Sequence, residues 1–203
     1  RVRVADLQDR CAGPHELVSR QLVDGSGTTD EVAADEFVWP IYKIDVRGRT
    51  FEDNFVQKRD IRAYEREHGR IPKGALVVLQ TGAEEFWGAD ELVVDDMGNA
   101  NNVDDLFDFV NPGFSSEAVQ WLFDRRHIDG VGSDAYGPDA ATDDGFGATF
   151  TALDNDGVAL VALANLDRVA ATGDIVMAPT VSLSEGSGFA TDPIACHGRQ
   201  RRR

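Results

Sequence analysis

The chain has 203 residues, which is enough for one domain with a substantial core and too few for two large domains. Asp and Glu total 36 against 20 Lys and Arg, so the formal net charge is −16. Such a surface repels nucleic acid phosphates, and no apolar run approaches the ~18–20 residues needed to cross a bilayer. We therefore expect a cytoplasmic protein with no nucleic acid and no membrane as partners.

The acidic composition has two explanations. The carboxylates could form a functional surface for cations or basic partners, or they could adapt the surface to concentrated salt, which screens their mutual repulsion. They are spread along the chain, which favours the second, halophilic explanation. We expect one domain over residues 1–198 and a basic tail at 199–203. Because the chain opens with Arg1 rather than Met, we also expect an incomplete N-terminus.

Strands and helices are predicted to alternate from the first third of the chain onward. Residues 40–46 are rich in β-branched and aromatic side chains and predict a strand that ends at Gly48. Residues 58–68 predict a helix with Ile61 and Tyr64 on one face.

The middle and the end of the chain continue this alternation. A continuous apolar run at 75–79 predicts a strand buried on both faces, and the Asp, Asn and Gly of 89–105 predict a surface excursion. Ser115 or Ser116 is expected to cap the next helix. Further strands are expected at 128–131, 158–163 and 175–178, and a further helix at 146–153. The pattern predicts an α/β domain.

Several short segments occur in a characteristic order between about residues 11 and 195. They are Glu67–Pro72, Leu79–Gly82, Gly113–Ala118 with Trp121 and Leu122, Gly130–Asp134, Ala164–Asp167 and Glu185–Gly188. Together they resemble the cyclase family of metal-dependent hydrolases, whose best-known members are the bacterial kynurenine formamidases. The resemblance implies a single-domain swivelling β/β/α fold, a homodimer, zinc or manganese as cofactor, and hydrolysis of N-formylkynurenine or a similar amide in tryptophan catabolism.

The first half of the family's metal site reads His-x-Gly-Thr-His-x-Asp-x-Pro, with another His four residues after the Asp. In the matching segment Gly13 and His15 are retained, and Cys11 takes the place of the first His. A thiolate can also bind zinc, so the resemblance assigns His15 and Cys11 as metal ligands. Leu17 replaces the bridging carboxylate. Gln21 occupies the family's catalytic His position, and an amide cannot transfer a proton in that role, so no catalytic residue is assigned.

The second half of the family's site is a His and a Glu twelve residues apart. Thr149 and Val161 occupy these two positions, and neither is a convincing metal ligand. Three interpretations stay open: an arylformamidase-like hydrolase with further ligands from elsewhere and a small-molecule amide as substrate, a non-catalytic relative used for binding or assembly, and the product of a decayed gene.

Four acidic residues near the second half of this site suggest a different metal. Asp134, Asp139, Asp143 and Asp144 could form an oxygen-rich site for calcium or magnesium, but their spacing matches no EF-hand loop. In so acidic a chain we expect them to be solvated surface carboxylates. Trp39 stands where the family tends to have glycine, and it is expected to crowd its strand.

Overall fold

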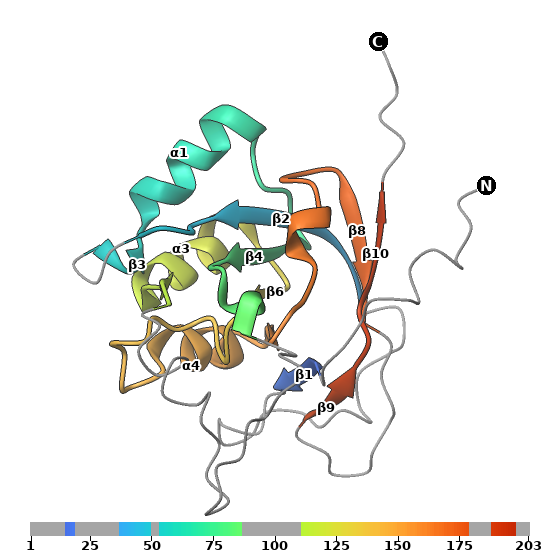
Figure 1. Ribbon diagram of the computed structural model, residues 1–203. Coiled ribbons are helices and arrows are strands. Elements are labelled where there is room, and N and C mark those ends of the chain that lie inside the picture. The colour runs from blue at the N-terminus through green and yellow to red at the C-terminus, as the bar shows by residue number, and fades with distance from the viewer. Residues whose placement is uncertain (1–14, 19–36, 50–52, 87–110, 179–187, 198–203) are drawn as a thin grey trace, which may run out of the picture.

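A computed structural model of the chain describes residues 15–18, 37–49, 53–86, 111–178 and 188–197. In these ranges an eight-stranded sheet has the order β10-β8-β2-β4-β6-β7-β1-β9, and β3 pairs with β5 (Figure 1). The large sheet consists of β1 (His15–Val18), β2 (Val38–Asp45), β4 (Leu76–Gln80), β6 (Gly130–Ser133), β7 (Val158–Val161), β8 (Asp174–Met177), β9 (Gly188–Thr191) and β10 (Ile194–His197). The other elements are β3 (Phe55–Val56), α1 (Lys58–His68), the 3-10 helix η5 (Ala83–Phe86), β5 (Gly113–Phe114), α3 (Ser116–Arg126), α4 (Gly147–Asp154) and the 3-10 helix η6 (Leu166–Arg168).

The centre of the large sheet is parallel and its flanks are antiparallel. Strands β2, β4, β6 and β7 run parallel, whereas β8 and β10 on one flank and β1 and β9 on the other pair antiparallel. Helices α1, α3 and α4 lie on one side of the central strands (Figure 1). A second apolar cluster fills the other side and includes residues of β8 and the segment around η6. The predicted α/β class is therefore confirmed.

Strand β4 is buried on both faces, as its apolar run predicted. Val77 and Leu79 belong to the cluster beneath the helices, and Leu76 and Val78 belong to the cluster on the opposite side. The predicted strands and helices agree with the observed elements to within about two residues at most of their ends. The expected excursion at 89–105 and the basic tail at 199–203 lie outside the described residues.

Trp39 is accommodated in the second cluster. It is almost fully buried on β2, and its ring meets Phe37 edge to face, with 6.1 Å between ring centroids. This arrangement is one that aromatic pairs favour. The expectation that Trp39 crowds its strand is wrong, because the layer opposite the helices has room for the indole.

The ends of α3 show how local residues define a helix. Ser115 is the N-cap, and its Oγ accepts a hydrogen bond from the Ala118 N–H at 3.2 Å. His127 ends the helix in the left-handed conformation, with φ of 53°. The sequence predicted a serine cap here, and the structure selects Ser115 over Ser116.

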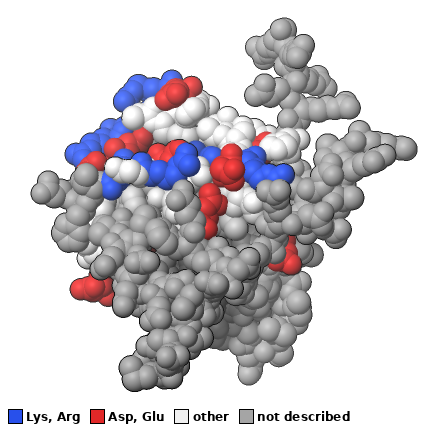
Figure 2. Space-filling model, viewed as in Figure 1, with Lys and Arg blue, Asp and Glu red and all other residues white. Residues whose placement is uncertain are grey.

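Helices α1 and α3 are joined through one arginine. The Arg126 guanidinium donates to both carboxylate oxygens of Glu65, with Nε–Oε1 2.5 Å and Nη2–Oε2 2.7 Å, and it lies 4.3 Å above the Trp121 ring. Burial opposes ionisation of Glu65, but hydrogen bonds from Arg126 and the Ile71 N–H outweigh it, so the pKa of Glu65 lies below its ordinary value. On the face shown in Figure 2, Lys and Arg gather where α1 lies.

Replacing Glu65 with Gln should lower the free energy of unfolding by about 1–3 kcal/mol, because it removes the charge from a largely buried bidentate pair. The matched control is Glu67→Gln on the same helix, whose side chain is 78% exposed, and it should change stability by less than about 0.5 kcal/mol. Chemical denaturation measures both. Equal effects of the two substitutions would contradict the role assigned to the Glu65–Arg126 pair.

Candidate functional site

A cavity of about 570 Å³ lies beside α4 and β7. Thr149 and Phe150 of α4 line it, together with Ala159 and Val161 of β7, and the loop between β6 and α4 supplies most of its other lining. Its volume is within the range of about 300–1,000 Å³ that is typical of small-molecule pockets. The two positions that the family resemblance assigned to metal ligands, Thr149 and Val161, therefore share one cavity.

The first half of the predicted site lies on the strand next to this cavity. Strand β1 pairs antiparallel with β7, and Glu16 is the register partner of Val161. His15 pairs with Thr191 of β9 on the other side of β1. The structure thus brings the strand that carries His15 next to the wall that carries Val161. Cys11 and Gln21, the other residues of the predicted site, lie outside the described residues.

Asp139 and Thr149 form a buried pair at the cavity. Asp139 Oδ1 accepts a hydrogen bond from the Thr149 N–H at 3.0 Å, and Oδ2 accepts one from the Thr149 hydroxyl. Asp139 is only 6% exposed. Burial raises the pKa of the Asp139 carboxyl, and the charge of Asp143 adds to the increase, whereas the hydrogen bonds from Thr149 and from the Ala148 backbone oppose it. The pair anchors the start of α4.

The expectation that the four aspartates are solvated surface groups is wrong for Asp139 and Asp134. Asp134 is fully buried, and its carboxylate accepts hydrogen bonds from the Thr81 N–H at 2.7 Å and the Gly82 N–H at 2.8 Å, so it holds the turn after β4. Burial of a carboxylate depends on such tertiary donors, which spacing along the chain does not reveal.

The four aspartates do not form one shared site. Asp143 accepts hydrogen bonds from the Gly145 and Gly147 N–H groups at the start of α4, and Asp144 is exposed. Across the residues that the structure describes, no group of three or more His, Cys, Asp or Glu side chains is arranged to hold a metal ion. The oxygen-rich calcium or magnesium site considered from the sequence therefore finds no support in this region.

Two wall positions of the cavity do not fit a divalent metal. The Thr149 hydroxyl is committed as a donor to Asp139, and Val161 is a buried hydrocarbon side chain on β7. Zinc and manganese need imidazole, thiolate or carboxylate ligands. Of the metal ligands that the resemblance assigned, the structure describes the backbone of His15 in β1.

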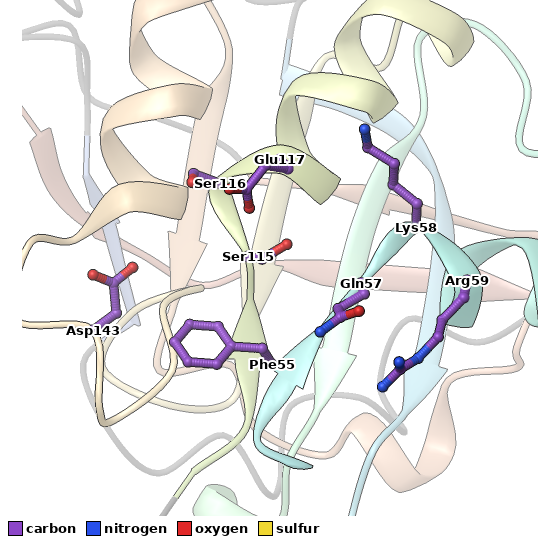
Figure 3. Close-up of a pocket in the computed structure, with 8 residues that line it drawn as sticks. All are labelled: Phe55, Gln57, Lys58, Arg59, Ser115, Ser116, Glu117 and Asp143. Carbon is purple, nitrogen blue, oxygen red and sulfur yellow. The ribbon is translucent and has the colours of Figure 1, made fainter. Parts of the chain in front are cut away.

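A second cavity, of about 670 Å³, lies where α1 and α3 begin (Figure 3). Gln57 and Ser115, the caps of the two helices, line it, and Asp143 lines both cavities. The polar groups that cap the two helices are used within the chain: Ser115 Oγ accepts from the Ala118 N–H, and the Gln57 N–H donates to Asp60. We interpret this second cavity as a junction of capped helices.

The fold and this arrangement define a member of the cyclase family. Residues 13–140, more than half of the chain, match the family model described as Putative cyclase, so the chain belongs to that family. The proteins it resembles include the isatin hydrolase of Roseibium aggregatum, which is 30% identical over 175 residues. That alignment covers 83% of this chain and 63% of the relative, so the chain spans less than two thirds of the relative's length.

Solved structures agree with this assignment. Isatin hydrolase A from Labrenzia aggregata superposes with a TM-score of 0.73 and 27% identity, over 89% of this chain and 71% of that one. A structure described as a potential metal-dependent hydrolase with cyclase activity has a TM-score of 0.62 and 19% identity, over 89% of this chain and 76% of that one, and it supports the fold alone. The predicted family and its fold are confirmed. The relatives that are 30% and 27% identical to this chain are isatin hydrolases. The comparisons therefore do not show the kynurenine formamidase activity that the sequence resemblance implied.

The described helices include none that is both long enough and apolar enough to cross a membrane.

Replacing Thr149 with Val should lower the free energy of unfolding by about 1–2 kcal/mol, because the buried Asp139 carboxylate loses a donor. Thr151→Val is the matched control on the same helix, since the Thr151 hydroxyl donates only to the Gly147 carbonyl one turn earlier. It should change stability by less than about 0.5 kcal/mol. Thermal or denaturant unfolding distinguishes the two, and equal losses would remove the special role of Thr149.

The effect of Thr149→Val should also depend on pH. Because the pKa of Asp139 is raised in the folded protein, ionisation of its carboxyl opposes folding. The stability that depends on the protonated carboxyl is fully present below pH 3.8, the ordinary pKa, and is lost as the pH rises through the folded-state pKa. The Thr149 hydroxyl stabilises the charged form. The destabilisation measured for Thr149→Val should therefore be larger at pH 7 than at pH 4, and a loss that does not change with pH would contradict this account.

Proposed function

We propose that this chain binds a small aromatic amide or lactam in the cavity between α4 and β7, and that it hydrolyses this ligand slowly or not at all. The observation that carries the proposal is the cavity itself, which has a small-molecule volume and is lined by Thr149 and Val161. The sequence resemblance assigns these two positions to metal ligands. The proposal includes a cytoplasmic homodimer with a salt-adapted surface and with no nucleic acid or membrane partner, in keeping with the composition and the family resemblance.

Two observations support an aromatic amide as the ligand. Phe146 and Phe150 line the cavity with Val161, which suits a flat apolar ring. The similar proteins at higher identity are isatin hydrolases, and isatin is a lactam fused to a benzene ring. N-formylkynurenine, the substrate that the sequence resemblance implies, also carries an amide on a benzene ring. Both compounds are therefore candidates.

The substitutions in the site argue against efficient hydrolysis. In hydrolases of this kind a bound divalent metal supplies an acidified water. In this chain Val161 offers a metal no ligand, and the Thr149 hydroxyl is committed to Asp139. Gln21 adds a further loss, because an amide does not take up or release a proton near neutral pH. What the chain has is a cavity of small-molecule volume that is lined in part by apolar side chains.

The second candidate is an active zinc or manganese hydrolase of the arylformamidase or isatin hydrolase type. It is favoured by the position of β1, which pairs with β7 and so carries His15 close to the cavity wall. Cys11 is the residue that would accompany His15 as a ligand. This candidate requires further ligands from outside the described residues or from a partner subunit.

The decisive experiment measures binding, turnover and metal content on the same preparation. The purified chain, kept in high salt, is dialysed against zinc or manganese and then against metal-free buffer. Isatin and N-formylkynurenine are titrated calorimetrically, and their hydrolysis is followed by absorbance. We expect saturable binding and a kcat/KM below about 10³ M⁻¹s⁻¹, whereas ordinary enzymes span about 10⁴–10⁸ M⁻¹s⁻¹.

Variants separate the two candidates. The second candidate predicts hydrolysis at ordinary rates and about one retained metal ion per chain. It also predicts that His15→Ala abolishes hydrolysis and metal retention, and that His68→Ala changes neither. These results together would establish the second candidate and overturn the first. His68 is a suitable control because it lies at the end of α1, where its ring contacts Tyr64. Absence of binding by either compound would overturn the assignment of the cavity as the ligand site.

A further inference from the structure

We propose that the cavity between α4 and β7 selects an aromatic ligand that carries a positive charge, such as an arylalkyl ammonium ion, over neutral and anionic ligands of the same shape. This inference rests on the proposed function, because it takes the cavity to be an aromatic binding site. It adds the charge of the ligand that this chain prefers.

The mouth of the cavity gathers exposed aromatic side chains. Among the described residues, the large aromatic side chains that are exposed are Tyr136, Phe146 and Phe150, at 66%, 59% and 41%. All three line this cavity. Large aromatic groups are normally buried, so their concentration at one opening marks a binding surface. The faces of such rings attract other rings and also cations.

The backbone of Phe146 indicates that its ring is held in place against a conformational preference. Phe146 has φ of 51° and ψ of 42°, the left-handed region that side chains with a Cβ rarely adopt. Its N–H donates to the Asp143 carbonyl at 3.2 Å, and its carbonyl accepts from the Phe150 N–H at 2.9 Å. A glycine would relieve this strain, yet the chain places a phenyl ring at the cavity. Strained residues of this kind cluster at ligand sites.

Among the described residues that line the cavity, the charged ones are all acidic: they are Asp139, Asp143 and Asp144. In the described part of the chain, none of these three carboxylates forms an ion pair with a basic side chain. Among the described residues on the face shown in Figure 2, Lys and Arg gather around α1, where acidic residues pair with several of them.

A cation in this cavity would lie close to these carboxylates. Burial, and to a smaller extent the neighbouring Asp143, raises the pKa of the Asp139 carboxyl, and a positive charge nearby would favour its ionised form. Each of its oxygens already accepts a hydrogen bond from Thr149, but a carboxylate oxygen can accept more than one. An ammonium group between the carboxylates and the aromatic rings would satisfy both, whereas a carboxylate on the ligand would be repelled.

Three probes of nearly equal shape test this selection: 2-phenylethylamine, which is cationic at pH 7, the neutral 2-phenylethanol, and the anionic 3-phenylpropanoate. Their dissociation constants are measured by calorimetry with the full chain at two salt concentrations that both keep it folded. We expect the amine to bind about tenfold or more tightly than the alcohol, and the anion to bind most weakly. The difference in affinity between the amine and the alcohol should become smaller at the higher salt concentration but should not disappear.

Matched variants locate the charge. Asp144 is exposed and lines the cavity, so Asp144→Asn should weaken binding of the amine by about threefold or more and leave binding of the alcohol unchanged. Asp154→Asn makes the same change of charge at the far end of α4, outside the cavity lining, and should leave both affinities unchanged. Phe150→Ala should weaken all three probes.

Two results would overturn the inference in distinguishable ways. Equal or tighter binding of the alcohol or of the anion, with binding still lowered by Phe150→Ala, would overturn the charge selection and leave the aromatic site of the proposed function in place. Failure of all three probes to bind a folded chain would overturn both. Equal effects of Asp144→Asn and Asp154→Asn would assign the selectivity to the net charge of the molecule and overturn its assignment to the cavity.

Discussion

The burial of β4 on both faces is the constraint on which the rest of the fold depends. All five of its residues are inaccessible to solvent, so each face requires its own covering layer. The helices cover one face, and the segment that runs through η6 into β8 covers the other. At the end of the strand the chain changes from apolar to polar: buried Gln80 accepts from Lys43 Nζ at 2.9 Å, and the next two N–H groups donate to Asp134.

The cavity beside α4 and β7 has no unsatisfied metal ligand at Thr149 and Val161, the two positions that the family resemblance assigns to metal ligands. Buried metal ligands that lose their metal leave unsatisfied polar or charged groups, which are costly in a core. Val161 on β7 is apolar, so its burial leaves no polar group unsatisfied. Thr149 on α4 is polar, but its hydroxyl donates a hydrogen bond to Asp139. Both residues are therefore compatible with a stable fold that has no bound metal. They line the wall of the cavity and offer a metal no ligand there.

The sequence predicted those features that depend on neighbouring residues. The helix at 58–68 and the buried strand at 75–79 follow from local periodicity and composition, and both are close to what is observed. The convergence of Thr149 and Val161 came from the family resemblance, and the shared cavity is consistent with it. The burial of Asp139 was missed because it depends on a backbone donor ten residues away, at the start of α4. Local sequence patterns predict that this helix forms, but they do not predict where it lies in the fold. The antiparallel pairing of β1 with β7 has the same non-local origin.

The exposed and the buried acidic residues of this chain need different explanations. The proposed adaptation to concentrated salt would account only for carboxylates that stay hydrated, because hydration and screening are surface effects. It does not account for Asp134 or Asp139, because both residues are buried. Asp134 is explained by the backbone turn that it holds after β4. Asp139 is explained only in part by α4, since burial and Asp143 still raise its pKa despite the hydrogen bonds from Thr149. Asp139 is thus a buried carboxylate at the cavity, and salt screens a buried charge less than it screens an exposed one.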